Sequence, residues 1–246
     1  MLIESPRITR RDMDVWRSRE RQDAVWARLP SLARKADAAL SVLREFAEAG
    51  PCWVGTSWGK DSVIVAHLAA TLHAEGCPAI PVVWFRAFPV GNPECSHVRD
   101  AFLATHRVAY EEVPCDIPLL SSGEWGIDEG YDPIWRAYHR RHPRHVLGLR
   151  AQESPVRALR MRTFGTTTKN TCAPIGRWSA KDVFGYLHKH ALPVHPTYAM
   201  SQGRAWDRER LRVAALGGTP GRGHGRAQWE EHYYGDVLLN ARRGGG

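Results

Sequence analysis

Residues 57–62, with the sequence SWGKDS, combine side chains that can hold an anion. A glycine in such a turn lets the backbone approach a ligand closely. An apolar segment typical of a helix follows, and the first turn of a helix offers unpaired N–H groups and the positive end of its dipole. Two hydroxyls, an ammonium and a carboxylate add hydrogen bonds and charge. The stretch therefore predicts a cradle of phosphate size, and an ordinary polar turn is the alternative. The sequence matches neither the Walker A pattern GxxxxGK[ST] nor the dinucleotide-binding pattern GxGxxG.

Two arginines, Arg150 and Arg157, lie seven residues apart, one at the end of an expected strand and one in the next expected helix. Both could converge on the carboxyl edge of a sheet, where bidentate contacts would suit a phosphate or sulfate; a solvated position is the alternative. Glu153 is expected either to cap the helix or to pair with an arginine. Ser154 is the expected N-cap, followed by Pro155 at the first helical position.

These residues need elements that bring them together, and apolar runs alternate with helical patterns along the chain. Alternation of this kind predicts an α/β fold with a parallel twisted sheet, helices on both faces and a Rossmann-like arrangement. Ligands of such sheets bind at the carboxyl ends of the strands. The expected strands are 52–56, 79–85, 108–114 and 145–150, and the expected helices are 63–76, 94–107, 133–142, 154–162 and 179–190.

Three segments divide the 246 residues. Residues 1–48 are expected to be a helical extension, because apolar side chains recur there every three or four positions. Residues 49–200 form the expected α/β domain. Residues 201–246 form a C-terminal extension with a Gly-rich loop at 217–225 and a last helix at 228–243. Trp206, Trp229, Tyr233 and Tyr234 in this extension could stack on bases, but ordinary packing is favoured.

Composition narrows the class of protein. No apolar run approaches the roughly 18 residues that span a bilayer, and the polar N-terminus is unlike a secretory signal. Five widely spaced cysteines without a CxxC pair speak against a disulfide scaffold or a zinc ribbon. His139, His142 and His145 do not form a convincing zinc site, because Pro143 interrupts them. We expect a cytoplasmic protein without a membrane partner.

The formal charge of +8 is unevenly distributed. Residues 136–162 contain eight arginines and one glutamate, whereas residues 94–132 contain nine acidic and two basic residues. The basic window includes Arg150 and Arg157. The charge therefore favours a local site for an anionic substrate, and a nucleic acid is one candidate that stays open.

Three ordered motifs resemble one known family. SWGKDS resembles the SGGKDS pyrophosphate loop of the PP-loop ATP pyrophosphatases, which belong to the adenine nucleotide alpha hydrolase-like superfamily. Residues 148–157 (GLRAQESPVR) and 173–187 (APIGRWSAKDVFGYL), followed by 192–198 (LPVHPTY), resemble segments of its phosphoadenosine phosphosulfate (PAPS) reductase family. The resemblance extends over roughly residues 50–200.

The resemblance implies an enzyme that binds ATP or a related adenine nucleotide, cleaves the bond between the α- and β-phosphates and adenylates a substrate, with sulfur transfer left open. It implies Lys60, Asp61 and Arg157 as catalytic residues and Asp61 as a ligand of Mg²⁺. The implied nucleotide-binding residues are Ser57, Trp58, Gly59, Lys60, Asp61, Ser62, Arg150, Glu153 and Ser154. The oligomeric state is not predicted.

The sequence also departs from the family. Trp58 stands where the family usually has glycine, and its side chain is expected either to point away from the phosphates or to narrow the cradle. PAPS reductases use a C-terminal cysteine, and no cysteine follows Cys172 in this sequence. This difference argues against a sulfonucleotide reductase, which is therefore kept as the alternative function. Cys172 itself could carry a persulfide, although an inert buried thiol is favoured. A non-catalytic nucleotide- or nucleic-acid-binding module is the third hypothesis.

Overall fold

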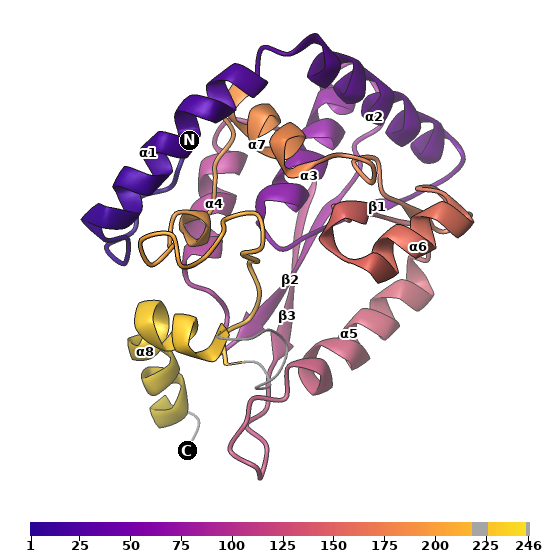
Figure 1. The fold of residues 1–246 in the computed structure, drawn as a ribbon. Helices are drawn as coiled ribbons and strands as arrows, with labels where there is room; N and C mark the ends of the chain where they lie inside the picture. The colour runs from indigo at the N-terminus through magenta and orange to yellow at the C-terminus, as the bar shows by residue number, and fades with distance from the viewer. Residues whose placement is uncertain (218–225, 245–246) are drawn as a thin grey trace.

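The computed structural model describes residues 1–217 and 226–244, and the predicted Gly-rich loop falls outside them except for Gly217. Five parallel strands form one sheet in the order β3-β2-β1-β4-β5. Helices cover both of its faces (Figure 1). The α/β class, the parallel sheet and the helices on both faces are therefore confirmed.

Most elements lie close to their expected places. The strands are β1 (Trp53–Thr56), β2 (Val82–Phe88), β3 (Tyr110–Asp116), β4 (His145–Leu147) and β5 (Thr171–Cys172). The helices are α1 (Arg10–Trp26), α2 (Pro30–Glu48), α3 (Lys60–Ala74), α4 (Glu94–Leu103), α5 (Ile127–Arg141), α6 (Pro155–Phe164), α7 (Ala180–Lys189) and α8 (Arg226–Gly244), with short 3-10 turns at Ala151–Glu153 and Pro196–Tyr198.

Three expectations need correction. Helix α5 begins at Ile127, six residues before the expected 133, and accommodates Pro133 inside it. Asp128 and Glu129 in its first turn favour that earlier start, because carboxylates stabilise the positive end of a helix. The strand expected at 145–150 ends at Leu147. Strand β5 was not predicted, since two residues give no recognisable alternation.

The two faces of the sheet pack differently. Successive side chains of a strand point to opposite faces, so Val82 and Trp84 join one core and Val83 and Phe85 the other. The first core also contains residues of α1, α2, α3, α4 and α7, and the second contains Trp135 and Tyr138 of α5. Buried residues of α1, α2 and α8 belong to the first core, so all three predicted segments share it.

The aromatic residues of the C-terminal segment pack into the core. Trp229 and Tyr234 are fully buried, Tyr233 is nearly so, and Trp206 packs against the same core. The Trp229 indole N–H donates to the Met200 carbonyl at 2.8 Å. The structure therefore gives these residues the packing role and leaves no exposed ring of Trp229 or Tyr234 for stacking on bases.

The order of the strands places the site. The chain adds β2 and β3 on one side of β1, and then crosses back to add β4 and β5 on the other side. The crevice between β1 and β4 is therefore the switch point at which open α/β sheets bind their ligands. SWGKDS follows β1 and Arg150 follows β4, so both motifs meet at this point.

Candidate functional site

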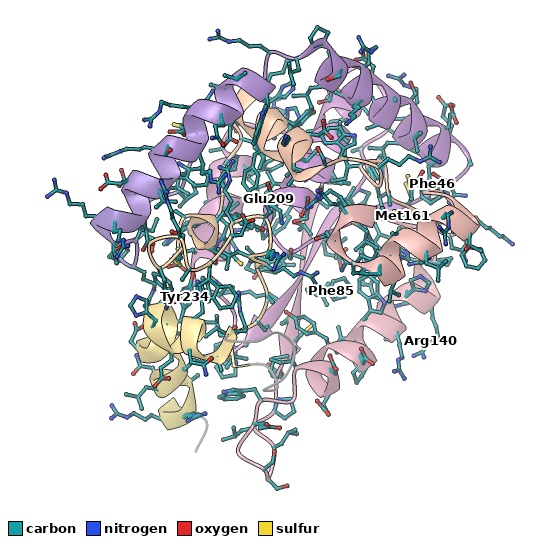
Figure 2. The ribbon with its side chains drawn as sticks, in the orientation of Figure 1. Phe46, Phe85, Arg140, Met161, Glu209 and Tyr234 are labelled. Atoms are coloured by element: carbon teal, nitrogen blue, oxygen red, sulfur yellow. The ribbon has the colours of Figure 1, made fainter. Side chains whose placement is uncertain are left out.

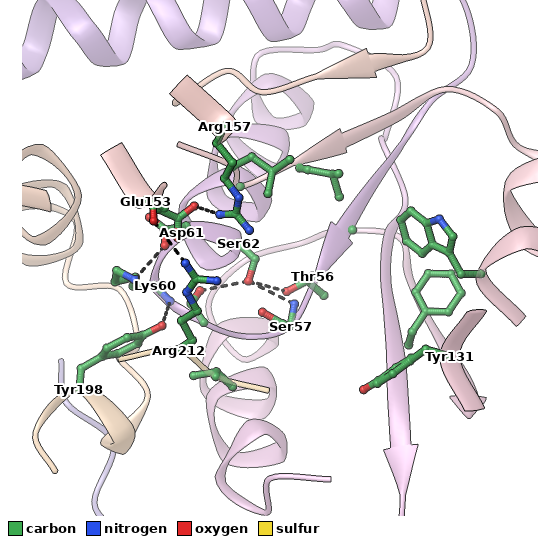
Figure 3. Close-up of a pocket in the computed structure, with 18 of the residues that line it drawn as sticks. Thr56, Ser57, Lys60, Asp61, Ser62, Tyr131, Glu153, Arg157, Tyr198 and Arg212 are labelled. Atoms are coloured by element: carbon green, nitrogen blue, oxygen red, sulfur yellow. Dashed lines mark hydrogen bonds and ion pairs between the residues drawn. The ribbon is translucent and has the colours of Figure 1, made fainter. Parts of the chain in front are cut away.

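A cavity of about 530 Å³ opens at the carboxyl ends of β1 and β4. Figure 3 shows the polar groups at one side of it and Tyr131 at the other. Its wall contains residues from β1, the loop 57–59, the first turn of α3, the end of β4, α5, α6 and the segment after α7. The polar lining residues include Thr56, Ser57, Lys60, Asp61, Ser62, Tyr131, Asp132, Glu153, Arg157, Tyr198 and Arg212, and the apolar ones include Phe85, Trp135, Leu147, Leu149 and Val213.

Hydrogen bonds within the chain fix the shape of the loop after β1. Ser57 donates its N–H to the Ser62 hydroxyl at 3.2 Å, and that hydroxyl donates to the Gly59 carbonyl at 3.0 Å. Trp58 donates its N–H to the Thr56 hydroxyl at 3.0 Å. Gly59 is the N-cap of α3 without a side-chain cap. The start of α3 therefore faces the cavity as a preorganised helix N-terminus, a favourable place for an anion.

Tyr198 holds the first residue of α3 from across the sequence. Its hydroxyl accepts the N–H of Lys60 at 3.0 Å, and the Lys60 ammonium lies 4.9 Å from the centre of its ring. Burial by itself would lower the pKa of Lys60, but Tyr198 and Asp61 raise it above the ordinary value. Lys60 therefore keeps its charge although its side chain is almost fully buried.

Asp61 is the centre of a buried ion network. Its Oδ2 lies 3.0 Å from the Lys60 Nζ, and its Oδ1 accepts from the Arg150 Nε at 2.6 Å. Both carboxylate oxygens thus have a cationic partner, and the described residues contain no group of three metal-ligating side chains. A Mg²⁺ ion at Asp61 would have to share these oxygens with Lys60 and Arg150 or displace them, and its ligation by Asp61 stays a prediction.

Arg150 has a different place from the one predicted for it. Its side chain is 2% exposed, and besides Asp61 it contacts the Gln152 amide oxygen at 3.2 Å and the Trp178 carbonyl at 3.4 Å. Arg150 borders a neighbouring cavity and is absent from the lining of the first one. The expectation that Arg150 and Arg157 converge on one anion is therefore wrong for Arg150, which holds Asp61 instead.

Gly148 explains how β4 can approach the loop so closely. A Cβ atom at this position would lie 2.6 Å from the Asp61 carbonyl carbon and 2.8 Å from the Ser62 nitrogen. Because these neighbours are backbone atoms, they could move apart only by displacing α3. Gly148, the first residue of the GLRAQESPVR motif, therefore allows the end of β4 and the first turn of α3 to lie this close together.

Of the two arginines that the sequence singled out, Arg157 reaches the cavity. It lies in the first turn of α6, its side chain is 31% exposed, and it pairs with the Glu153 carboxylate (Figure 3). Glu153 also accepts the backbone N–H of Arg150 at 3.2 Å and so caps the short 3-10 turn Ala151–Glu153. Of its two expected roles, pairing with an arginine is confirmed, whereas Ser154 caps the helix. Ser154 caps α6 by accepting the N–H of Arg157 at 3.2 Å, as predicted. Ser154 borders the neighbouring cavity instead of the first.

Trp58 points away from the site. Its side chain is fully buried, 5.6 Å from the ring of Phe102 and 5.8 Å from that of Tyr110. Its φ is +58°, in the left-handed region that costs a residue with a Cβ about 1–2 kcal/mol. A glycine would adopt this backbone without strain. The indole ring packs in the core, although its buried N–H has no hydrogen-bond partner among the described residues, and Trp58 does not line the cavity.

Several lining residues could not be found from the sequence. Tyr198 closes the segment 192–198 but was not predicted to line the site, and neither was Arg212. Arg212 donates to the Glu153 carbonyl at 3.4 Å and lies between the first cavity and the neighbouring one. Three further lining residues lie on α5. Tyr131 and Asp132 precede the expected helix start at 133, and Trp135 lies just after it. No local pattern distinguishes them, because the fold alone brings them to β1.

The cysteines lie outside the cavity. None of the five lines it, and neither 218–225 nor 245–246 contains another. Burial raises the pKa of the Cys172 thiol to about 12, so its thiolate is scarce at neutral pH. The favoured prediction for Cys172, an inert buried thiol, agrees with this placement. His139 contacts His145 at 3.1 Å without forming a metal-ligating group in the described parts of the chain.

The fold and the site together define an α/β architecture with a cavity at the switch point of its parallel sheet. A solved structure with the same fold is the PAPS reductase from Candida auris in a phosphate complex, with a TM-score of 0.50 and 13% identity over 74% of this chain and 90% of that one. This likeness confirms the predicted PAPS reductase-like fold. Protein-family models and curated proteins give no match. No helix within residues 1–217 and 226–244 is long and apolar enough to cross a membrane.

Proposed function

We propose that the chain is a PAPS reductase-family PP-loop enzyme that binds ATP in the cavity, cleaves the bond between the α- and β-phosphates and transfers AMP to an acceptor. One observation carries this proposal: the N-terminus of α3, Lys60 and Arg157 border one cavity at the switch point of the sheet. Such a site suits a pyrophosphate group, because it combines a helix N-terminus with two positive side chains. The similar PAPS reductase structure is a phosphate complex, which is consistent with an anion site in this fold.

The reaction needs charge stabilisation more than covalent help from the protein. An acceptor oxygen attacks the α-phosphorus, a new P–O bond forms, and the bond to the β-phosphate oxygen breaks with its electron pair leaving on pyrophosphate. The acceptor's proton is released to solvent. Lys60 and Arg157 border the cavity and in this proposal neutralise charge on the leaving group, because fixed positive groups lower such a barrier.

Binding of the nucleoside would use the opposite part of the cavity. Phe85 and Trp135 contact each other there, with ring centres 5.1 Å apart, and Tyr131 lies beside them in the wall. Aromatic and aliphatic walls are typical of pockets that take a planar heterocycle. The cavity thus offers a charged part for phosphates and an aromatic part for the base.

The products of ATP test the proposal directly. We expect ³¹P NMR of the protein with ATP, Mg²⁺ and water as the acceptor to show AMP and pyrophosphate. Lys60→Ala should lower this rate about 100-fold or more, since it removes a charge on the leaving group. Lys189→Ala, at the exposed end of α7, is the matched control. Formation of ADP and phosphate, or failure of both ATP and pyrophosphate to bind in calorimetry, would refute the proposal.

The sulfonucleotide reductase alternative rests on the fold alone. A reductase that attacks sulfur needs a nucleophile near the ligand, and the five cysteines lie outside the cavity lining. We expect no sulfite from PAPS and a thiol donor, whether measured with the wild type or with Cys172→Ala. Sulfite release that disappears in a variant without cysteines would instead establish the reductase.

A further inference from the structure

The neighbouring cavity adjoins the first one at two residues. Its volume is about 580 Å³, and Glu153 and Arg212 border it as well as the first cavity. Figure 3 shows Arg212 on the same side of the first cavity as Lys60, where the pyrophosphate group is proposed to bind. A molecule in the neighbouring cavity would therefore lie next to a nucleotide in the first.

Residues 207–212, with the sequence DRERLR, form one wall of the neighbouring cavity. Two of them anchor this segment in the protein. Arg208 makes a buried bidentate ion pair with Asp23, in which its Nη1 donates at 2.8 Å, and Leu211 is 1% exposed. Figure 2 shows Glu209 on the segment, near α7. The anchors hold the other four side chains along the cavity: Asp207, Glu209, Arg210 and Arg212.

The charged side chains of the neighbouring cavity divide into two groups. Two of them are used inside the protein, because Arg150 holds Asp61 and Glu153 pairs with Arg157. The second group forms no ion pair with any residue that the structure describes, and it consists of Asp207, Glu209, Arg210 and Arg212. Two carboxylates and two guanidinium groups therefore border one cavity without a salt bridge between them.

These four unpaired charges favour one class of ligand. A ligand with negative charge alone would be repelled by the two carboxylates, and one with positive charge alone by the two guanidinium groups. A zwitterion can place each of its charges beside the opposite sign. Guanidinium groups match a carboxylate in bidentate geometry, and carboxylate side chains accept the N–H groups of an ammonium.

The positions of Arg212 and Glu209 decide which end of such a ligand faces the nucleotide. Arg212 borders both the first and the neighbouring cavity, so a carboxylate bound to it lies at the wall that the two cavities share. Glu209 is absent from the lining of the first cavity and borders a third one, together with Trp26 and Lys181. The ammonium end therefore belongs at Glu209, and the carboxylate end points toward the nucleotide.

We propose that the neighbouring cavity binds a small zwitterion with a carboxylate and a protonated amine, and that this molecule is the acceptor of the AMP group. The second half rests on the proposed function. A carboxylate oxygen attacks the α-phosphorus, a P–O bond forms, and the bond to the β-phosphate oxygen breaks with its electron pair leaving on pyrophosphate. The products are an acyl adenylate and pyrophosphate. Because a carboxylate attacks as the anion, this acceptor has no proton to release.

Isothermal titration calorimetry without ATP tests the binding step. The probes are unbranched amino carboxylates of increasing length, from glycine through 4-aminobutanoate to 6-aminohexanoate. We expect at least one of them to bind, and the plain carboxylate and the plain amine of the same chain length to bind about tenfold or more weakly, since each lacks one charged contact. Absence of binding throughout the series, or equal affinity of a probe and its plain carboxylate or amine, would overturn the inference.

Single substitutions assign the two ends of the ligand. Glu209→Gln should weaken the zwitterion about tenfold without weakening the plain carboxylate, and Arg212→Gln should weaken the zwitterion and the plain carboxylate but not the amine. Glu48→Gln and Arg34→Gln make the same charge changes at exposed positions of α2 and should leave all affinities unchanged. Thermal unfolding checks that each variant is folded. Equal weakening by site and control variants, or the same loss for zwitterion and plain carboxylate in Glu209→Gln, would contradict this assignment.

The acceptor role and the ATP proposal can fail separately. Hydroxylamine converts an acyl adenylate into a hydroxamate and AMP. With ATP, Mg²⁺, hydroxylamine and the zwitterion that binds best, we expect a hydroxamate, and pyrophosphate formation faster than with water alone. Lys60→Ala should abolish the hydroxamate and retain binding of the zwitterion. AMP and pyrophosphate without hydroxamate would refute the acceptor role and leave the ATP proposal intact. A bound zwitterion without any cleavage of ATP would refute the ATP proposal and leave the binding site standing.

Discussion

Helices α3 and α6 both border the cavity, but the protein builds them in opposite ways. Eleven of the fifteen residues of α3 are buried, and none of the ten residues of α6 is. The polar groups at the start of α3 are bonded to one another and to Tyr198 and Arg150. Arg157 on α6 has one carboxylate partner, Glu153. Helix α3 therefore holds its first turn in a fixed position, whereas α6 carries a positive side chain that a ligand can reach.

Removing Arg150 should have the largest effect on folding. Arg150→Met leaves Asp61 buried with Lys60 as its remaining cation, and loss of one partner of a buried pair costs about 3–5 kcal/mol. Urea denaturation measures the free energy of unfolding. The matched variant Arg157→Met breaks a partly exposed pair and should cost less than about 1 kcal/mol. Equal losses in both variants would contradict the distinction between the two helices.

Ligand binding should show the reverse order. Arg157→Ala should weaken pyrophosphate about 10- to 100-fold, because a hydrogen bond to a charged group contributes about 1.5–3 kcal/mol. Isothermal titration calorimetry measures this, with Arg162→Ala on the same helix as the control, since Arg162 lies outside the cavity lining. An unchanged affinity in Arg157→Ala would assign the anion to another part of the site.

Much of this arrangement could be predicted from the sequence, and the rest depends on distant contacts. The polar loop after β1 and the N-cap of α6 at Ser154 have local signatures, and the structure has both. The partners of the site have none. Tyr198 and Lys60 are 138 residues apart, and Arg150 and Asp61 are 89 apart. The same reason explains Trp58, whose direction depends on Phe102 and Tyr110.

Gly59 offers a finer test of how tightly the α3 side is fixed. A Cβ atom at Gly59 would lie 2.9 Å from the Tyr198 hydroxyl oxygen. Gly59→Ala should therefore cost about 1–3 kcal/mol through overpacking, and Tyr198→Phe about 1 kcal/mol through the lost hydrogen bond. In the double variant the clash is relieved, so thermal unfolding should give a total cost below the sum. Additive costs would show that the hydroxyl does not constrain the loop.

The last prediction concerns pH and the middle of α3, where His67 lies. Burial, followed by the charges of His190 and His106, lowers the pKa of His67 to about 3. The unfolded imidazole takes up a proton below about pH 6.5 and the folded one does not. Stability from this group is therefore complete above pH 6.5 and falls as the pH approaches 3, by up to about 1.4 kcal/mol per pH unit.

A variant isolates this contribution. The free energy of unfolding of His67→Gln should fall less steeply than that of the wild type between pH 6.5 and 4.5. His73→Gln, at an exposed position near the end of the same helix, is the control and should retain the wild-type slope. Identical slopes in all three proteins would mean that His67 takes up its proton in the folded state as it does in the unfolded chain.

Glu153 has a consequence for how an anion enters the site. Its carboxylate pairs with Arg157 and accepts the N–H of Arg150, so it occupies Arg157 much as a phosphate oxygen would. An arriving anion must displace this internal competitor, which lowers its affinity. In return the arginine is already ordered before the ligand arrives, so less side-chain entropy is lost on binding. If an anion binds Arg157 as proposed, Glu153 would be exchanged for it, and ligands with more than one negative oxygen would be favoured.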